Sequence, residues 1–404
     1  VEVIDIACDE CPVDGIQVSE ACRGCIAHRC KTACPKDAIT IENHKAHIDK
    51  NKCIECGRCM SVCPYSAIVK TVRPCEKACK VDAIRVGEDK KANIDNEKCI
   101  ACGTCVYQCP FGAVVDKSYI LDCISLLKGS ENNTKYKVYA VVAPSIYGQF
   151  EQHKLEQVVS GIKELGFYNV FEAAVGADMT AYHESRELLE KKFLTTSCCP
   201  AFVSYVQKNF PDMAEHISHN TSPMVQISEC LKKIEPSCKV VFIGPCIAKK
   251  SERKQDRVKD IIDCVITFEE LQALFDSREL DLDSLPEEHL NNASYYGRIF
   301  ARSGGVATAV GQALKESGME EFPYNPISCN GIEECRVALL KARKGMLPNN
   351  FIEGMACEGG CVQGPAQLIR SPKNQGDVDR HAKLAFEKTI TDAVSVFEEV
   401  RNQE

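Results

Sequence analysis

Cysteine is the residue type whose spacing carries the clearest chemistry, with 27 cysteines among 404 residues. Two runs share the pattern Cys-x2-Cys-x2-Cys-x3-Cys-Pro, and a third run is stretched by two residues. Short loops of this kind can place three soft thiolates around one face of an iron–sulfur cubane, while the fourth cysteine binds the neighbouring cluster. A disulfide framework is the alternative, but cysteines three residues apart rarely pair in so regular an array. The runs are Cys53, Cys56, Cys59 and Cys63; Cys99, Cys102, Cys105 and Cys109; and Cys22, Cys25, Cys30 and Cys34.

An internal repeat, with an offset of 45 to 46 residues, predicts two tandem ferredoxin-like modules whose clusters serve as their cores. The second module lacks its own first cysteine pair, and the N-terminal pair Cys8 and Cys11 has no other assignment. The crossover rule then predicts about four accessory 4Fe–4S clusters, the last by elimination. The predicted ligand sets are Cys22, Cys25, Cys30 and Cys63; Cys34, Cys53, Cys56 and Cys59; Cys79, Cys99, Cys102 and Cys105; and Cys8, Cys11, Cys75 and Cys109.

The other cysteines of the chain divide into motif and non-motif residues. Those outside any motif are interpreted as buried small hydrophobic residues. His28 occupies the place of a third cysteine in an unstretched run, but Cys30 restores the spacing, so the histidine is interpreted as a bystander. The non-motif cysteines are Cys123, Cys230, Cys238, Cys264, Cys329 and Cys335.

From about Lys135 the sequence alternates between apolar strand-like runs and helical patterns. This alternation predicts an α/β catalytic domain with largely parallel sheets over residues 126–404, preceded by a small α+β tandem ferredoxin-like domain over residues 1–125. The acidic stretch 276–288 is expected to be a solvated surface loop. Strands are predicted at 136–143, 169–174, 193–197, 239–243 and 265–268, and helices at 155–165, 179–192, 203–210 and 305–314.

Three further cysteine motifs each follow a predicted strand directly. Because ligands bind at the carboxyl ends of strands in open α/β folds, the three loops are expected to converge on one pocket. The Gly359-Gly360 pair would let the backbone approach a bulky ligand closely, and Lys249 would place a cation beside it. The motif cysteines are Cys198 and Cys199, Cys246, and Cys357 and Cys361.

These motifs, TSCCP at 196–200, PC-x2-KK-x-E at 245–252 and MAC-x-GGC-x2-G at 355–364, resemble the three signatures of FeFe-hydrogenase catalytic subunits in the same order. The resemblance covers the whole chain and implies an H-cluster, a 4Fe–4S cubane joined to a diiron subsite with carbon monoxide, cyanide and azadithiolate ligands. It implies that Cys361 bridges to the diiron subsite and that Cys198 is an unligated thiol that passes protons. Ligands of the cubane would be Cys199, Cys246, Cys357 and Cys361.

The resemblance also implies roles for other residues around the cluster. Lys249 would contact a cyanide, Met355 would pack near the diiron subsite, and Ser145 would lie beside the dithiolate bridge. A proton relay would consist of the following residues: Glu184, Ser218 and Glu187. The two glutamates are three residues apart, and hence on one helix face; without the TSCCP motif this spacing would indicate a solvated acidic face.

Four sites depart from the best-known members of that family. Ala201 and Phe202 stand in place of Gly-Trp, and Gly244 in place of a methionine near the bridging carbonyl. Glu358 replaces a proline, and Met224 stands where a glutamine is common. Since all four thiolate ligands and the proton-carrying thiol remain, these departures bear on rate, bias and oxygen response rather than on the identity of the site.

The function expected from the resemblance is reversible dihydrogen oxidation and proton reduction, with a soluble ferredoxin-like electron carrier and hydrogenase maturation proteins as partners. A net charge of −8 disfavours nucleic acid as a partner, and no run of eighteen apolar residues or signal-peptide pattern occurs, so no membrane span is expected. Many free thiols favour a reducing, cytoplasmic location. The alternatives are a non-enzymatic iron–sulfur assembly factor or a hydrogen-sensing protein, although the sequence shows no signalling domain; a plain polyferredoxin would not explain the last 280 residues.

Overall fold

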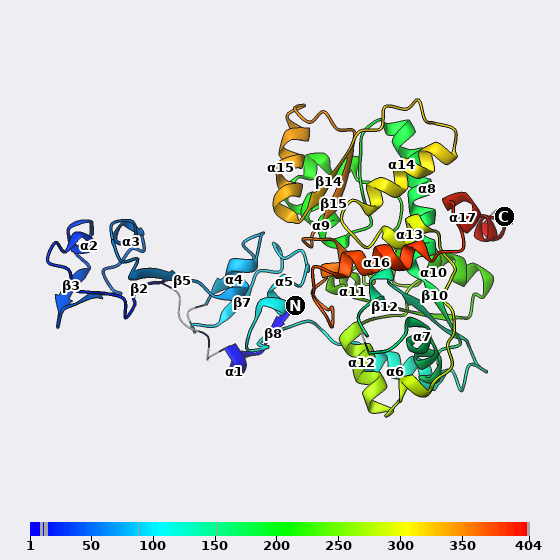
Figure 1. The fold of residues 1–404 in the computed structure, drawn as a ribbon, viewed down its shortest axis with the longest axis horizontal. Coiled ribbons are helices and arrows are strands. Elements are labelled where there is room, and N and C mark those ends of the chain that lie inside the picture. Colours follow the sequence, from blue (N-terminus) through cyan, green and yellow to red (C-terminus); the bar gives the residue numbers. More distant parts are fainter. Residues whose placement is uncertain (9–10, 12–14, 88, 151, 402–404) are drawn as a thin grey trace. The chain divides into compact units, whose positions relative to one another are not determined.

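The computed structural model describes residues 1–8, 11, 15–87, 89–150 and 152–401 (Figure 1). Packing within the chain separates two units, each considered by itself below. The smaller unit is Glu2–Asp95 with Gln108–Val115, and the larger unit is Val1, Asn96–Tyr107 and Asp116–Glu404. The second cysteine run is thus divided between the units, and the boundary between residues 125 and 126 stays a prediction.

The smaller unit consists of short helices and two-stranded antiparallel sheets, as predicted for an α+β ferredoxin-like domain. Its sheets pair β1 with β8, β2 with β5, β3 with β4, and β6 with β7. The strands are β1 (Glu2–Val3), β2 (Gly15–Val18), β3 (Ile39–Glu42), β4 (Lys45–Ile48), β5 (Ile68–Thr71), β6 (Ile84–Val86), β7 (Ala92–Ile94) and β8 (Val114–Val115). The helices are α1 (Asp5–Cys8), α2 (Arg29–Thr32), α3 (Arg58–Ser61) and α4 (Pro74–Ala78), and α5 (Thr104–Gln108) crosses into the larger unit.

One turn recurs after Cys34, Cys63, Cys79 and Cys109 and shows how the repeat is built. Three residues after Cys34, Asp37 adopts a left-handed backbone with φ of 46°. Ala38 follows, is 1% exposed, and donates its N–H to Cys34 Sγ at 3.3 Å. The short alanine lets the backbone donor reach the sulfur, so this turn holds the thiol in place. The corresponding left-handed residues are Ser66, Asp82 and Gly112, and the corresponding buried alanines are Ala67, Ala83 and Ala113.

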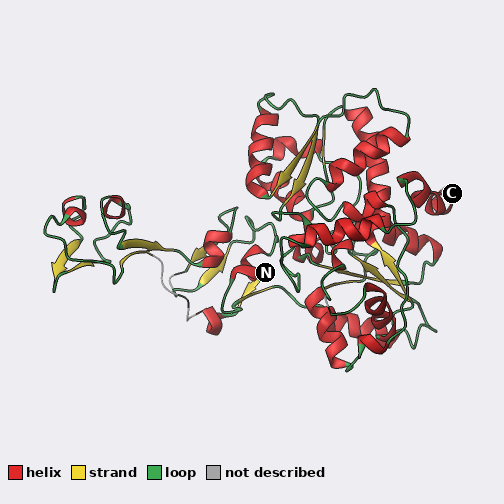
Figure 2. Cartoon of the chain, viewed as in Figure 1, coloured by secondary structure: helices red, strands yellow, loops and turns green. Residues whose placement is uncertain are grey.

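The larger unit contains two parallel sheets surrounded by helices (Figure 2), which confirms the predicted α/β fold. The first sheet has the order β10-β9-β12-β13 and the second β11-β15-β14. All five residues of β9 are buried, as expected for a strand covered on both faces. The strands are β9 (Val138–Val142), β10 (Asn169–Glu172), β11 (Leu194–Thr195), β12 (Lys239–Gly244), β13 (Cys264–Thr267), β14 (Pro326–Asn330) and β15 (Phe351–Met355).

The helices of this unit mostly follow the expected alternation. The α-helices are α6 (Ile120–Gly129), α7 (Leu155–Glu164), α8 (Ala173–Lys191), α9 (Pro200–Asn209), α10 (Pro223–Ile234), α11 (Ile247–Glu252), α12 (Phe268–Ser277), α13 (Tyr295–Ile299), α14 (Gly305–Glu316), α15 (Ile332–Arg343), α16 (Asn374–Lys383) and α17 (Ile390–Arg401). Short 3-10 helices are η1 (Pro144–Ile146), η2 (Pro211–His216), η3 (Leu282–Ser284) and η4 (Cys361–Gln363). Among the described residues, none of these helices combines the length and the apolarity needed to cross a bilayer.

Two predicted boundaries in this unit were wrong. The strand expected over 169–174 ends at Glu172, and α8 begins at Ala173, six residues before its predicted start. The residues that open α8 are small and buried because other helices approach closely: a Cβ on Gly176 would lie 2.0 Å from the carbonyl oxygen of Pro223. The acidic stretch is not simply a solvated loop, since Leu282 is 3% exposed and packs in the core.

Candidate cofactor and proton-transfer site

Three loops of the larger unit bring together the motif cysteines. Cys199 follows β11 as the residue before α9, and Cys246 follows β12 as the residue before α11. Cys357 and Cys361 lie in the loop after β15. Burial and the neighbouring thiols Cys246, Cys199 and Cys361 raise the pKa of Cys357, so all four thiols lie close to one another.

The four cysteines are partly buried, and this burial affects how their thiols bind a cofactor. Burial, with the charge of Cys199, raises the pKa of Cys246 to about 11, and burial with Cys246 and Cys199 raises that of Cys361 to about 12. A thiol must lose its proton to bind iron, so cluster insertion has to supply the free energy of deprotonation. The shifts fit a site whose thiolates are formed when they bind the positively charged iron of a cluster.

A cavity of about 90 Å³ lies next to these thiols and contains few polar groups. Ser145 is 1% exposed, and its hydroxyl has no hydrogen-bond partner within the described part of the chain. Buried hydroxyls are nearly always paired, so Ser145 indicates a missing polar ligand. The lining residues are Ala143, Pro144, Ser145, Ala173, Ala177, Cys198, Cys199, Pro200, Pro223, Met224, Phe242, Pro245, Cys246, Lys249, Phe300, Ala301, Met355 and Cys361.

Lys249 places a fixed cation at this cavity. Its Nζ donates to Glu252 Oε2 at 2.8 Å and to the carbonyl oxygen of Cys198 at 3.2 Å. Burial alone would lower the pKa of Lys249, but the Glu252 carboxylate raises it above its usual value, so the ammonium stays charged. The sequence analysis assigned no role to Glu252. Its spacing, three residues after Lys249 on α11, was the available signal.

The donor set therefore fits an anionic iron–sulfur cluster with polar ligands. The thiols of Cys199, Cys246 and Cys361, one buried ammonium and one unpaired hydroxyl line the same cavity, and Cys357 lies close to these thiols. Among the described residues, no three His, Cys, Asp or Glu side chains are placed to hold a single metal ion. This is the expected result for a cubane, whose four irons keep its thiolate ligands farther apart than one ion would.

Cys198 connects this cavity to a buried carboxyl group. It is 9% exposed, and burial together with the nearby Glu184 carboxylate raises the pKa of its thiol well above the usual value. Glu184 is fully buried and accepts a hydrogen bond from the backbone N–H of Ser197 at 3.3 Å. Ser197 and Cys198 are adjacent in sequence, so the carboxyl group lies close behind the thiol. The sequence analysis did not identify this role of Ser197.

The pKa of Glu184 is raised to about 8. Burial is the main cause, and the negative charge of Glu187 adds to it, whereas the hydrogen bond from Ser197 lowers the pKa. A weaker polar contact with Ser218 lowers it. One carboxyl oxygen, Oε2, has no hydrogen-bond partner in the described part of the chain. Glu184 can therefore hold or release a proton near neutral pH, as a relay group must.

Ser218 and Glu187 continue the chain of polar groups toward solvent. The Ser218 hydroxyl donates to Glu187 Oε2 at 2.8 Å, and Asn220 Nδ2 donates to the same oxygen at 2.9 Å. Glu187 also pairs with Lys191 at 2.8 Å and lies 3.2 Å from the ring of His219, whose side chain is 81% exposed. Although partial burial opposes it, the hydrogen bond from Lys191 lowers the pKa of Glu187 below its usual value. Asn220 lies between η2 and α10, far from Glu187 in the sequence, so no local spacing predicts this contact.

The two glutamates on α8 thus differ in their protonation. Glu184, inside, keeps its proton near neutral pH, whereas Glu187, at the surface, is ionised. The structure places both beside Ser218, in the order expected of a relay. The alternative of a solvated acidic face does not apply to Glu184, which is fully buried.

Two of the unusual residues near the cavity are explained by their packing. A Cβ on Gly244 would lie 2.7 Å from the Phe242 ring, so this ring fills the space that a larger residue at 244 would need. Similarly, Phe202 is fully buried, and its ring lies 2.4 Å from the place of a Cβ on Gly354. Both rings occupy space beside the motif loops that a larger residue at 244 or 354 would need.

The Gly359-Gly360 pair has a more specific role than the sequence suggested. Both glycines have left-handed backbones, with φ of 92° and 88°. A Cβ on Gly360 would lie 2.7 Å from the backbone nitrogen of Ser303 and 2.8 Å from the carbonyl oxygen of Ala301. The close approach in the structure is therefore to another loop of the chain, and it fixes where Cys361 lies.

In the smaller unit, the structure brings together members of three predicted accessory sets. Cys34, Cys53, Cys56 and Cys59 line one pocket. Burial raises the pKa of Cys30, and Cys25 and Cys63 are close enough to raise it further. The set of Cys79 with Cys99, Cys102 and Cys105 spans both units and stays a prediction. The remaining set, Cys8, Cys11, Cys75 and Cys109, lines a second pocket.

This last set, assigned by elimination, also includes a buried cation. Arg73 is 1% exposed, lines the pocket, and donates from Nη1 to Cys8 Sγ at 3.3 Å. Ala92 donates its backbone N–H to the same sulfur, also at 3.3 Å. Burial and the thiols Cys109, Cys11 and Cys8 raise the pKa of Cys75 to about 11. The four thiols therefore share one environment, and Arg73 would lie against whatever they bind.

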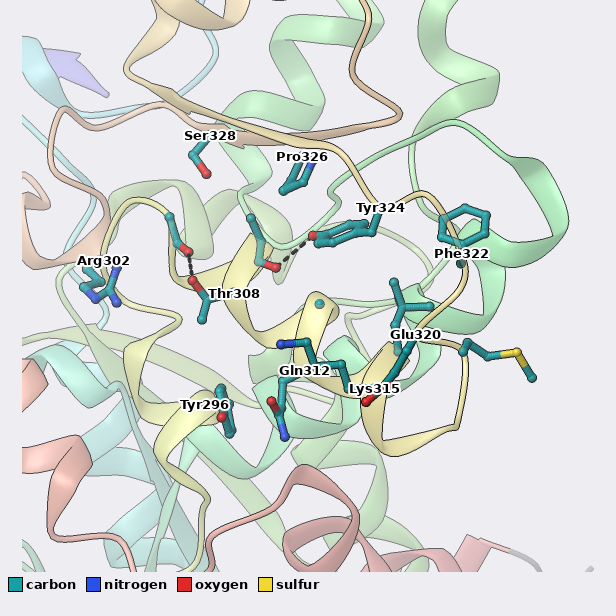
Figure 3. A pocket seen from close by; sticks show the side chains of 15 residues that line it. Tyr296, Arg302, Thr308, Gln312, Lys315, Glu320, Phe322, Tyr324, Pro326 and Ser328 are labelled. Carbon is teal, nitrogen blue, oxygen red and sulfur yellow. Dashed lines mark hydrogen bonds between the residues drawn. The ribbon is translucent and has the colours of Figure 1, made fainter.

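A much larger cleft of about 1020 Å³ lies elsewhere in the larger unit, beside α14 (Figure 3). Arg302, Thr308, Gln312 and Tyr324 are among its lining residues. Two of these are engaged by the fold: the Thr308 hydroxyl donates to the carbonyl oxygen of Gly304, and the Tyr324 hydroxyl to that of Ala307. None of the residues that line this cleft is a cysteine.

Comparison with known protein families agrees with this fold and site. The family described as "Iron only hydrogenase large subunit, C-terminal domain" matches residues 136–365, and "4Fe-4S binding domain" matches residues 46–69 and 92–115. The chain belongs to the iron-only hydrogenase large-subunit family. It carries 4Fe–4S binding domains ahead of the hydrogenase domain.

Individual relatives are distant. Iron hydrogenase 1 of Clostridium pasteurianum is 28% identical, over 87% of this chain and 70% of its own. The periplasmic [Fe] hydrogenase large subunit of Nitratidesulfovibrio vulgaris is 30% identical, and the match covers 81% of this chain and 87% of that protein. A solved FeFe-hydrogenase structure from Chlamydomonas reinhardtii shares the fold with a TM-score of 0.58 at 21% identity, covering 71% of this chain and 95% of that one.

Proposed function

We propose that this protein catalyses the reversible oxidation of dihydrogen to protons and electrons. The observation that carries the proposal is the succession of groups from the thiol-lined cavity, through the thiol of Cys198 and buried Glu184, to Ser218 and Glu187. A site that only stored iron and sulfur would need the ligands, but it would not need a buried proton path.

The residues that would hold an H-cluster are Cys199, Cys246, Cys357 and Cys361, with Cys361 shared with the diiron subsite. When bound, this group supplies the iron centre at which dihydrogen is cleaved or formed. Lys249 would contribute a fixed positive charge to its polar ligands, and Ser145 an otherwise unpaired hydroxyl. Met355, 2% exposed, would exclude water from the cavity.

The protein's own part in turnover would be proton transfer. Cys198 would exchange a proton with the cofactor side of the cavity, and Glu184 would accept or return it. Because Glu184 titrates near pH 8, its own gain or loss of a proton costs little free energy at neutral pH. Ser218 and Glu187 would then exchange the proton with solvent near His219.

Electrons would travel through the accessory clusters to a soluble ferredoxin-like carrier, and maturation proteins would insert the diiron subsite. A non-enzymatic assembly factor is the second candidate, since such proteins also show similarity: one from Kluyveromyces lactis is 33% identical over 24% of this chain. The buried relay behind Cys198 favours the enzyme, because cluster delivery requires no proton path. A hydrogen sensor would bind dihydrogen at the same site, but its turnover would be lower than that of an enzyme.

The test is anaerobic maturation followed by infrared spectroscopy and dihydrogen-dependent reduction of methyl viologen. We expect infrared bands of bound carbon monoxide and cyanide, together with turnover. Cys198→Ala should keep the bands and lose most turnover, because alanine cannot carry a proton. Cys230→Ala, which changes a buried cysteine outside the site, is the matched control. Bands without turnover in the wild type would refute the enzymatic proposal; missing bands in Cys198→Ala alone would make Cys198 a ligand.

A further inference from the structure

The first ferredoxin-like module, residues 15–71, differs in charge from the rest of the chain. It contains nine Lys and Arg residues against five Asp and Glu, a net charge of +4, whereas the whole chain carries −8. The remaining residues therefore carry −12. A basic module on an acidic protein creates a local positive potential that attracts acidic partners and speeds their association.

Much of this positive charge is available to a partner. Lys45, Lys52 and Lys70 are each within ion-pair distance of an acidic residue. The other exposed cations of the module form no ion pair with any described residue. These exposed cations without an ion pair are Arg23, Arg29, Lys31, Lys36, Lys50 and Arg58, of which Lys50 donates to the carbonyl oxygen of Ile16.

Two of these cations flank the most exposed cysteine of the protein. Cys56 is exposed, whereas the other 26 cysteines are buried or partly buried. It lines the same pocket as Lys36 and Ile54, and Arg58 follows two residues later at the start of α3. Ile54 is 57% exposed, which is unusual for a large apolar residue between two cluster ligands. Helix α2, which carries Arg29 and Lys31, contacts α3.

The internal repeat provides a comparison for this exposure. Ile100 occupies the position of Ile54 in the second module, between Cys99 and Cys102, and it is only 3% exposed. The apolar position is therefore covered in one copy and open in the other. An open apolar residue among cations, beside an exposed cluster ligand, has the composition of a transient electron-transfer interface.

We propose that Lys36, Ile54, Cys56 and Arg58, here called the docking surface, bind an acidic one-electron carrier protein of the ferredoxin type. The carrier exchanges electrons with the cluster of Cys34, Cys53, Cys56 and Cys59. This inference rests on the proposed function. The transfer makes and breaks no covalent bond: two reduced carriers each give one electron, and two protons then form one dihydrogen, with the reverse in oxidation.

The test combines binding and kinetics with an acidic bacterial ferredoxin as the probe. In the double variant Lys36→Glu/Arg58→Glu, charge reversal should raise Kd and the KM for ferredoxin at least tenfold at low salt. The difference should shrink as ionic strength rises, because exposed charges are screened. Methyl viologen, which needs no protein docking, should be reduced within twofold of the wild-type rate. Ile54→Ala should weaken ferredoxin binding without any change in its salt dependence.

A matched control places the same charge change on the larger unit. Lys315→Glu/Lys344→Glu reverses two exposed cations there and should leave ferredoxin kinetics nearly unchanged. If ferredoxin binding weakens equally in both double variants, the loss is due to net charge and the docking surface is refuted. An unchanged Kd in Lys36→Glu/Arg58→Glu would also refute it. If no protein reduces viologen, the wild type included, the proposed function fails, while the Kd comparison still decides the docking surface. Iron content and the visible spectrum confirm that the variants are folded.

Discussion

Glu184→Gln should make the protein slower and, at alkaline pH, more stable. The substitution keeps the size of the side chain and its acceptor for Ser197 N–H, but removes the titrating proton. Because Glu184 lies between Cys198 and Ser218, turnover should fall by about 100-fold or more, the range of a lost proton-transfer group. The accessory clusters lie outside this relay, so their spectra should not change.

The stability effect follows from the raised pKa. Glu184 titrates near 8 in the folded protein and at the ordinary 4.5 when unfolded, so between these pH values the folded state holds the extra proton. The free energy of unfolding then falls by about 1.4 kcal/mol per pH unit as pH rises. Between pH 5.5 and 7.5 the wild type loses about 2.7 kcal/mol from this group, and the Gln variant does not. For a chain of this size that equals roughly 3 °C in Tm.

The assay is thermal unfolding from pH 5.5 to 7.5 beside viologen-linked turnover, with Glu190→Gln as control. Glu190 lies on the same helix but is exposed, so its change should be silent in both measurements. The Tm difference between Glu184→Gln and wild type should grow with pH while turnover stays low. A pH-independent Tm difference would refute the raised pKa, and wild-type turnover would refute the relay.

Three further predictions concern the relay and the accessory clusters. Glu187→Gln should reduce turnover less than Glu184→Gln, because water can replace a half-buried group near His219; an equal loss would place the proton exit elsewhere. Cys8→Ser/Cys11→Ser should remove about four irons per chain and keep the infrared bands, and unchanged iron would disprove their ligand role. Arg73→Gln should lower the midpoint potential of one accessory cluster by about 0.1 V in redox titration, since a unit charge about 6 Å away contributes roughly 3 kcal/mol at an effective permittivity near 20. An unchanged midpoint potential would show that Arg73 does not lie against a cluster.

The parts of the site that the sequence could predict are those encoded locally. Counting the cysteines and eliminating those already assigned grouped Cys8 and Cys11 with Cys75 and Cys109, and the structure places all four at one pocket. The convergence of the three motif loops followed from their positions at strand ends. Both predictions, the cysteine set and the convergence of the loops, depend on local sequence patterns and on one general rule of topology.

Contacts between distant segments could not be predicted. Ser197, in the loop after β11, and Asn220, between η2 and α10, join the relay only through their contacts with the glutamates of α8, and neither has a spacing signal. The early start of α8 likewise has a tertiary cause. Ala174 and Gly176 contact other helices closely, and an apolar stretch without polar residues does not distinguish a strand from a buried helix.

The distribution of the four thiols over two sheets has a consequence for the assembly of the protein. Cys246 extends from the first sheet, at the end of β12, whereas Cys199, Cys357 and Cys361 extend from the second, at the ends of β11 and β15. A cluster bound by all four therefore crosslinks two separately hydrogen-bonded sheets. Its binding free energy becomes cohesion between the two halves of the unit. Without the cubane, the two halves lack this crosslink.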